Sequence, residues 1–261
     1  MKRTLYIAGA GLASDLISLR ALNVLKNVNK IFLDGYTGIL LRNGSTLKDI
    51  IQKDYYILRR KDVEDEGGEI IFKALEDGDV ALLVPGDALI ATTHVNLMIE
   101  ARKRGYNVVI IPGISIVSAA ISLSGLMIYK LGKIVTLTYP KDGIIYDYPY
   151  DVIKDNSLRN LHTLLLLEMD AERGVYMTVH EALKILLEIE RIRNEGVISD
   201  DRIVVGVSRL GSDDMRICPG LLKDIMKCDL GEPPHTLILT SPKLHFIEEE
   251  ALKVVKDVFC K

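Results

Sequence analysis

Cysteine is scarce in this chain of 261 residues, which has only Cys218, Cys228 and Cys260. An odd number of widely spaced cysteines is typical neither of a disulfide framework nor of a Cys-x-x-Cys metal site. We therefore expect three reduced thiols in a cytoplasmic protein, and no bound metal.

Long apolar runs are missing as well. No stretch reaches the roughly 18 apolar residues that a membrane span needs, so we expect no membrane attachment. The N-terminal segment MKRTLYIAGAGL carries two basic residues, but its apolar part is short and rich in glycine. This pattern indicates the first strand of a fold and not a signal peptide.

An excess of charge of either sign is also absent. The chain has 33 basic and 36 acidic residues, which gives a net charge of −3 and makes nucleic acid a poor candidate partner. Tryptophan is missing and Gln52 is the only glutamine, while charged and aliphatic residues abound. That composition leans towards a heat-adapted source. The length suits two domains of ordinary size.

Strands and helices are expected to alternate in the first half of the chain, which is typical of a parallel sheet with right-handed crossovers. Ser14 and Asp15 are expected to cap the first helix. The expected strands are 4–11, 30–35, 54–60, 79–86 and 106–113, and the expected helices are 15–28, 46–52, 67–78 and 94–105.

The second half predicts a mixed sheet. Segments 201–211 and 215–220 are expected to pair as antiparallel strands. Thr178 and Glu181 have the spacing of a capping box. The other expected strands are 132–140, 161–170 and 233–241, and the expected helices are 113–126, 151–160, 178–196 and 246–259.

The fold class is therefore α/β with two domains. We place an N-terminal α/β domain with a mostly parallel sheet at 1–113, and a C-terminal α/β domain with a mixed sheet at 114–261.

The glycine turn IAGAGLASD follows the first expected strand. Gly9 and Gly11 match the start of a dinucleotide-binding fingerprint, although residue 14 is Ser. Asp34 comes 23 residues after Gly11, about where such a fold places the acid that binds a ribose. A tight turn from strand to helix favours glycine for backbone reasons alone, so an NAD site and a structural turn both stay open here.

The segment VPGDALIATTH, residues 84–94, joins a buried strand to an acidic turn and two threonines. Asp87 lies just past the carboxyl end of that strand, where open α/β sheets bind ligands. Its carboxylate is suited to a ligand hydroxyl or ammonium group, or it is simply a turn residue. Thr92 and Thr93 are expected to offer hydroxyls to a ligand or to cap the helix that begins at His94.

Motifs of several other enzyme classes are missing. The chain has no Ser-His-Asp spacing, no His-x-x-x-His helix and no Walker loop, so hydrolase, zinc and P-loop hypotheses lack support. The charged segment 59–69 is interpreted as a solvated surface or as part of a docking site for a partner.

Seven motifs occur in order across nearly the whole chain: LYIAGAGL, VPGDALIATTH, GLMIYKLGKIVTL, YDVIKDNSLRNLHTLLLLEMD, MTVHEAL, SRLGSDD and GEPPHTLIL. In this combination the chain resembles the diphthine synthases, which are S-adenosylmethionine-dependent methyltransferases. They are similar in plan to the tetrapyrrole methylases, whose two α/β domains hold the cofactor in the cleft between them. The resemblance points to the archaeal type of the family.

The resemblance implies a role for the glycine turn in lining the cleft, and it makes Asp34 a loop or substrate-side residue. Residue 88 is Ala where the family usually has Pro, so we expect a looser loop that keeps Asp87. The cofactor-binding residues that the resemblance implies are Leu12, Asp87, Ile90, Ser115, Ile116, Leu167, Leu210 and His235.

The implied reaction moves methyl groups from S-adenosylmethionine to the amino nitrogen of an aminocarboxypropyl-histidine on elongation factor 2, in diphthamide biosynthesis. S-adenosylhomocysteine is the implied product, and a homodimer is the implied assembly. Archaeal relatives stop at the trimethylammonium group, whereas eukaryotic ones continue to a methyl ester. No catalytic base is evident, since His94 and His235 are weak candidates.

Three alternatives remain. The first is a methylase of the same fold that acts on a tetrapyrrole or another small molecule. The second is an NAD-dependent oxidoreductase, based on Gly9, Gly11 and Asp34. The third is a noncatalytic protein that binds S-adenosylmethionine.

Overall fold

The computed structural model describes residues 2–260, which divide into two compact units. Unit 1 holds the residues up to Ile116 together with Asp170–Val175 and Gly211–Asp213. Unit 2 holds Val117–Met169, Tyr176–Leu210 and the residues from Asp214 onward. The domain boundary at 113/114 stays a prediction.

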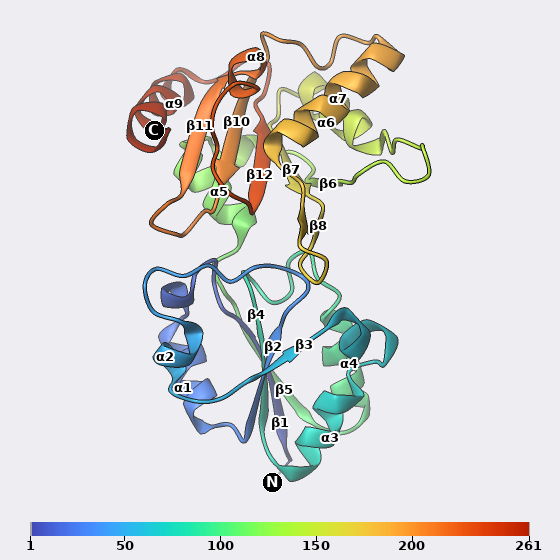
Figure 1. Ribbon diagram of the computed structural model, residues 1–261, viewed down its shortest axis with the longest axis vertical. Helices are drawn as coiled ribbons and strands as arrows, with labels where there is room; N and C mark the ends of the chain where they lie inside the picture. The colour runs from blue at the N-terminus through green and yellow to red at the C-terminus, as the bar shows by residue number, and fades with distance from the viewer. Residues whose placement is uncertain (1, 261) are drawn as a thin grey trace. The chain divides into compact units, whose positions relative to one another are not determined.

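Unit 1 contains a five-stranded sheet that is parallel, as predicted, and its strand order is β3-β2-β4-β1-β5 (Figure 1). Strand β4 is central, and all five of its residues are buried. The strands are β1 (Thr4–Gly9), β2 (Lys30–Asp34), β3 (Tyr56–Leu58), β4 (Val80–Val84) and β5 (Asn107–Ile111).

Helices cover both faces of this sheet, α1 and α2 on one side and α3 and α4 on the other (Figure 1). They are α1 (Leu19–Asn27), α2 (Leu47–Ile51), α3 (Glu69–Asp77) and α4 (Val95–Lys103), with a 3₁₀ turn η1 (Ser14–Leu16) and a π-helical turn η2 (Lys61–Asp65).

One sequence expectation in unit 1 is wrong. The first helix begins at Leu19 and not at residue 15, because the Ser18 side chain accepts a hydrogen bond from the Ala21 amide at 3.1 Å and caps it. The charged segment 59–69 contains η2. Local ion pairs such as Arg60–Glu64, at 3.0 Å, hold that turn on the surface.

Unit 2 contains a mixed five-stranded sheet in the order β11-β10-β12-β7-β6. The β6–β7 pair is parallel and the other pairs are antiparallel, including the predicted β10–β11 hairpin. Its strands are β6 (Val135–Leu137), β7 (Thr163–Leu167), β10 (Ile203–Ser208), β11 (Arg216–Leu221) and β12 (His235–Leu239). A separate two-stranded sheet, β8 (Met169–Asp170) with β9 (Val175–Tyr176), was not predicted, and its residues Asp170 and Val175 belong to unit 1.

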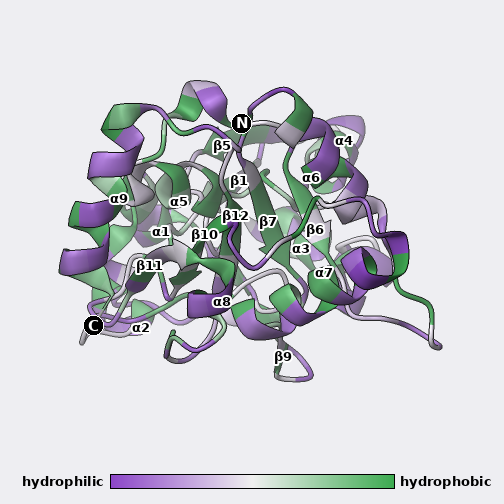
Figure 2. Ribbon diagram, turned by 90° about the horizontal axis from the view of Figure 1, so that it is seen from above, coloured by the Kyte–Doolittle hydropathy of each residue, from purple (hydrophilic) through white to green (hydrophobic). Residues whose placement is uncertain are grey.

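The strands of both sheets are largely apolar, whereas the helices alternate polar and apolar residues (Figure 2). The predicted capping box of α7 is confirmed, since Thr178 Oγ1 accepts from the Glu181 amide at 3.2 Å and a Glu181 carboxylate oxygen accepts from the Thr178 amide at 2.8 Å. The remaining helices are α5 (Ile116–Ser124), η3 (Ile128–Lys130), α6 (Tyr148–Leu158), α7 (Val179–Arg193), α8 (Leu222–Ile225) and α9 (Phe246–Phe259).

The expectation of three reduced thiols is wrong. Cys218 in β11 and Cys260 at the end of α9 form a disulfide. The spacing of the cysteines along the chain does not predict this disulfide. The disulfide depends on the packing of α9 against β11 (Figure 1).

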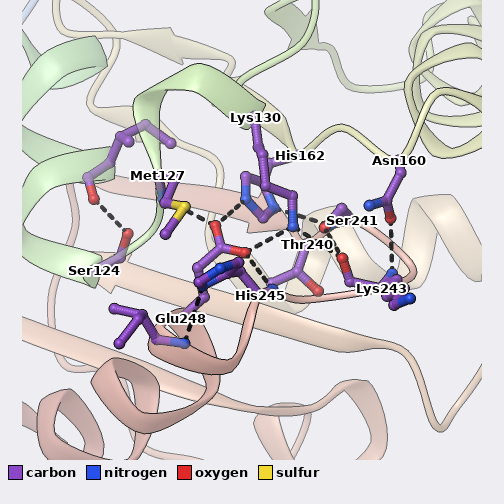
Figure 3. Close-up of polar contacts among 12 residues, drawn as sticks. Ser124, Met127, Lys130, Asn160, His162, Thr240, Ser241, Lys243, His245 and Glu248 are labelled. Carbon is purple, nitrogen blue, oxygen red and sulfur yellow. Dashed lines mark hydrogen bonds and ion pairs between the residues drawn. The ribbon is translucent and has the colours of Figure 1, made fainter.

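Unit 2 also buries an acidic side chain at the start of α9. The Glu248 carboxylate is fully buried and lies 2.7 Å from Lys130 Nζ and 2.8 Å from His162 Nε2 (Figure 3). It also accepts from the amides of Met127 and His245, both at 2.9 Å. This network, which we name the Glu248 cluster, fastens the chain after α5 to the first turn of α9.

The charge of Glu248 is stabilised within this cluster. Burial raises its pKa, but the hydrogen bonds from the His245 amide, Lys130, the Met127 amide and His162 outweigh burial and lower the pKa to about 2.

Among the helices of residues 2–260, none combines the length and the apolar character that crossing a membrane requires.

Candidate functional site

Three glycines bring the carboxyl ends of β1, β4 and β5 into close contact. Gly9 ends β1, Gly86 follows β4 and Gly113 follows β5. A Cβ atom on Gly9 would lie 2.6 Å from both Gly113 Cα and the Gly86 carbonyl oxygen, so only glycine fits there. This edge of the parallel sheet is where α/β folds bind ligands.

Backbone hydrogen bonds join the loops after β1 and β4. The Gly86 amide donates to the Gly11 carbonyl at 2.7 Å, and the Gly11 amide donates back to the Gly86 carbonyl at 3.1 Å. The Gly11 amide is therefore not available to a pyrophosphate. The chain continues into η1, so no α-helix N-terminus follows the turn directly.

Asp34 is equally unavailable to a ribose. The residue is only 1% exposed, and its carboxylate accepts hydrogen bonds from the Tyr36 amide at 2.8 Å and the Thr37 amide at 3.0 Å. The Thr37 hydroxyl donates to the other carboxylate oxygen. The hypothesis of an NAD-dependent oxidoreductase, which needed Asp34 and the glycine turn, is wrong.

Asp87 links two of the three strand ends. One carboxylate oxygen accepts from the Leu89 amide, and the other accepts from the Gly113 amide after β5, both at 3.0 Å. A carboxylate accepts about four hydrogen bonds, so Asp87 keeps capacity for a ligand hydroxyl or ammonium group.

Several contacts hold the loop after Asp87, and its expected looseness relative to a loop with Pro at position 88 stays a prediction. Ala88 is fully buried, and its carbonyl oxygen accepts from Thr92 Oγ1 at 2.8 Å. His94 Nδ1 lies 3.2 Å from the same oxygen. Thr93 bonds the Glu64 carboxylate at 3.1 Å, and neither threonine caps α4. We name residues 86–91 the Asp87 loop.

His94 connects the Asp87 loop to Asp34. Both side chains are fully buried, and His94 Nε2 lies 3.2 Å from Asp34 Oδ2, an ion-pair distance without the angle of a well-aligned hydrogen bond. Burial raises the pKa of Asp34, but its contacts with His94, Thr37 and the Tyr36 amide outweigh burial and leave the pKa below its ordinary value. Asp34 is therefore ionised at neutral pH and holds His94 in place.

The other candidate residues of unit 1 lie in segments that leave the same sheet edge. Leu12 is half-buried after β1, and its carbonyl accepts from the Leu41 amide at 3.1 Å. Ile90 exposes 45% of its surface on the Asp87 loop. Ser115 is buried and Ile116 is half-buried where the chain enters α5 after β5.

The three candidate residues of unit 2 lie at one edge of its sheet. Leu167 ends β7, His235 begins β12 and Leu210 follows β10 by two residues. The register supports this placement, because Ser208 pairs with His235 and Leu166 pairs with Thr236.

His235 is held on both of its ring nitrogens. Its Nδ1 accepts from the Val179 amide at 3.2 Å, and its Nε2 lies 3.1 Å from the Gly231 carbonyl. Burial lowers the pKa of His235, which favours the neutral ring. A ring held in this way is not a free base.

The chain matches the model of the Tetrapyrrole (Corrin/Porphyrin) Methylases family over residues 4–226. It is 40% identical to the diphthine synthase of Sulfurisphaera tokodaii over 96% of this chain and 98% of the relative. It is 41% identical to the diphthine synthase of Methanocaldococcus jannaschii over 95% of this chain and 97% of the relative. A crystal structure of diphthine synthase superposes with a TM-score of 0.86 at 30% identity, covering 97% of this chain and 96% of that one.

The chain belongs to the diphthine synthase family. It is therefore an S-adenosylmethionine-dependent methyltransferase with the α/β fold of the tetrapyrrole methylases, as the sequence motifs predict. The two relatives named here are archaeal, which is consistent with the expected archaeal type.

The side chains that support the Asp87 loop were not identified from the sequence of this diphthine synthase family member. The sequence predicted Gly113 only as the end of a strand, and its contact with Gly9 was not predicted. The Asp34–His94 pair was also missed, because the two residues are 60 positions apart. The one available signal was that both residues follow or flank strand ends of the same parallel sheet.

Proposed function

We propose that this protein transfers methyl groups from S-adenosylmethionine to the amino nitrogen of the aminocarboxypropyl-histidine of elongation factor 2. The observation that carries the proposal is the likeness to diphthine synthases over at least 95% of the chain. The glycine-packed edge of unit 1 supports it, because the family's Pro-Gly-Asp motif lies at the edge of a parallel sheet, where α/β folds bind ligands.

The chemistry of the residues suits the cofactor. We propose that it contacts Leu12, Asp87, Ile90, Ser115, Ile116, Leu167, Leu210 and His235. The aliphatic members of this set are suited to the adenine ring, and the remaining acceptor capacity of Asp87 is suited to a ribose hydroxyl or the ammonium group. S-adenosylmethionine supplies the methyl group on its sulfonium when it is bound.

Positioning is the main catalytic contribution of the protein. The leaving group of the transfer is a neutral thioether, so the protein has no developing anion to stabilise. It holds the amine in line with the methyl carbon and excludes water. The amine reacts only when it is unprotonated, and an amine with a pKa near that of Lys is mostly protonated at pH 7.

Neither histidine that the sequence offered as a base is free for that task. Both ring nitrogens of His94 and of His235 face hydrogen-bond partners or a carboxylate. Deprotonation therefore falls to solvent, and we expect kcat/KM to rise with pH by about tenfold per unit from pH 7 until the amine is unprotonated.

A homodimer is the proposed assembly. The apolar segment 113–126 and helix 178–193 are the two candidate interfaces, and 113–126 adjoins more exposed apolar surface than helix 178–193 does. Tyr129 is 94% exposed and Ile128 is 53% exposed just after α5, whereas the large exposed apolar residue of α7 is Ile192. Sedimentation of the protein and of Tyr129→Glu tests this: a dimer that the substitution dissociates supports the interface, and an unchanged dimer excludes it.

Intact mass spectrometry of elongation factor 2 tests the activity. The factor, bearing the aminocarboxypropyl-histidine, is incubated with the protein and S-adenosylmethionine. A gain of three methyl masses establishes the archaeal reaction, and a gain of four indicates the ester-forming variant. No gain, when another diphthine synthase methylates the same preparation, excludes the proposal and favours a small-molecule acceptor.

A further inference from the structure

The three cysteines of the chain converge on one place in unit 2. They lie in β11, after α8 and at the end of α9, yet their sulfur atoms are all within 4.8 Å of one another. Cys218 and Cys260 are bonded, and Cys228 Sγ lies 3.6 Å from Cys260 Sγ. Since the whole chain has only these three cysteines, their meeting at one point indicates a site.

We propose that Cys218, Cys228 and Cys260 form a thiol–disulfide exchange site, in which Cys260 bonds with either of the other two cysteines. The Cys228 sulfur is in van der Waals contact with one sulfur of the existing bond, from which a thiolate can attack it. The site connects the C-terminal end of α9 to the sheet, whereas the Glu248 cluster holds the N-terminal end of α9.

The exchange is balanced without any other reagent. The Cys228 thiolate attacks Cys260 Sγ, a Cys228–Cys260 bond forms, and the Cys218–Cys260 bond breaks. Cys218 leaves as a thiolate and takes up the proton that Cys228 lost. Formation of the first disulfide from two thiols does need an oxidant, which we identify by class as an external disulfide that takes up two electrons and two protons.

The groups around Cys228 shift the pKa of its thiol in opposite directions. Burial and the neighbouring Asp229 raise the pKa of the Cys228 thiol, whereas Arg216 and Lys256 lower it less. From α7, His180 Nε2 lies 2.9 Å from the Cys228 carbonyl. With its pKa above the ordinary value, Cys228 is mainly a thiol at pH 7, so exchange should accelerate as the pH rises.

The backbone favours a disulfide over a metal site. The Cα atoms of Cys218 and Cys260 are 4.7 Å apart, within the range of about 4.4 to 6.8 Å that disulfides occupy. Structural zinc sites use four protein ligands, but among residues 2–260 no ligand atom of His, Asp or Glu joins the three sulfurs.

Disulfide mapping of the full-length protein tests the proposal. Wild type, C218S, C228S and C260S are equilibrated in one glutathione redox buffer, free thiols are capped with N-ethylmaleimide, and unreduced digests are analysed by mass spectrometry. We expect C218S to form Cys228–Cys260 at a yield within about tenfold of the Cys218–Cys260 yield in C228S. C260S should form no internal disulfide.

Two results would overturn the proposal. One is a C218S protein that stays reduced in the buffer that oxidises C228S. The other is one zinc ion per purified wild-type chain that capping of the thiols releases, which would make the cluster a metal site. Because C218S alters a buried position, the wild type is also mapped after incubation at pH 7 and pH 9. A Cys228–Cys260 fraction that grows with pH supports exchange, and its absence at both pH values contradicts it.

Discussion

Unit 1 buries the Asp34 carboxylate beside His94, and unit 2 buries the Glu248 carboxylate beside His162. All four side chains are inaccessible to solvent, but their hydrogen bonds differ. His162 lies between a donor and an acceptor, because its Nδ1 accepts from the Ser241 amide at 2.8 Å and its Nε2 faces Glu248 (Figure 3). A neutral ring satisfies both contacts.

His94 lies between two acceptors, the Ala88 carbonyl and the Asp34 carboxylate. The Asp34 contact has an ion-pair distance of 3.2 Å, but His94 Nε2 makes no well-aligned hydrogen bond. The comparison teaches that similar pairs serve different purposes. The Glu248–His162 pair is a complete structural network that joins α9 to the rest of unit 2, whereas the Asp34–His94 pair supports a loop at the proposed cofactor site.

The largest expected effect is on stability, in Glu248→Ala. This change leaves Lys130, His162 and two backbone amides without their acceptor in a buried place. We expect a loss of about 3 to 5 kcal/mol in the free energy of unfolding, measured by urea denaturation. Glu249→Ala, at the exposed neighbouring position, should change it by about 0.5 kcal/mol or less. Equal losses in both variants would show that the cluster has no special role.

Acid should weaken the same network. The folded-state pKa of Glu248 is about 2, against an ordinary value of 4.5, so the stability that its charge provides is present above pH 4.5 and is lost as the pH falls towards 2. Burial lowers the pKa of His162 below 6.5, so protonation of the unfolded chain also favours unfolding below that pH.

Together these shifts predict a loss on the order of 3 kcal/mol between pH 7 and pH 3. Urea denaturation across this range measures it. Glu248→Gln should flatten the part of the curve below pH 4.5, and a curve identical to that of the wild type would contradict the assignment.

A smaller effect, confined to ligand binding, is expected for Asp34→Asn. The amide keeps an acceptor for Tyr36 and Thr37 but loses the charge that attracts His94, so the Asp87 loop is held less firmly. We expect S-adenosylhomocysteine to bind about tenfold more weakly, which corresponds to about 1.4 kcal/mol. Calorimetry measures this, with the exposed Asp77→Asn as the control. Unchanged affinity in Asp34→Asn would show that the Asp34–His94 pair does not contribute to ligand binding.

The smallest effect is spectroscopic. Nitrogen NMR of the His162 ring at pH 7 should find one protonated nitrogen, because burial lowers the pKa of His162 and its Nδ1 accepts from the Ser241 amide. Two protonated nitrogens in His162 at pH 7 would contradict this assignment.

Local features were predictable from the sequence. The capping box of Thr178 and Glu181 depends on a spacing of three residues, and the parallel sheet of unit 1 follows from alternating strands and helices. The start of α1 was misplaced because Ser14 and Ser18 both have side chains that cap helices, and only the observed backbone selects Ser18.

Long-range contacts were not predictable. The Glu248–His162 contact joins residues 86 positions apart, and the disulfide joins residues 42 apart. Composition and periodicity carry no information on such pairs. The motifs around Asp87 located the candidate site, but they did not reveal that His94 and Gly113 hold its loop.

The binding of S-adenosylhomocysteine to His94→Asn and His162→Asn tests the central claim most directly. Each variant is first shown to be folded by circular dichroism, and the dissociation constant is then measured by calorimetry at 25 °C. We predict binding about tenfold weaker in His94→Asn and within about twofold of the wild type in His162→Asn. Equal losses, or a larger loss in His162→Asn, would contradict the division between a pair that supports the site and a pair that supports the fold.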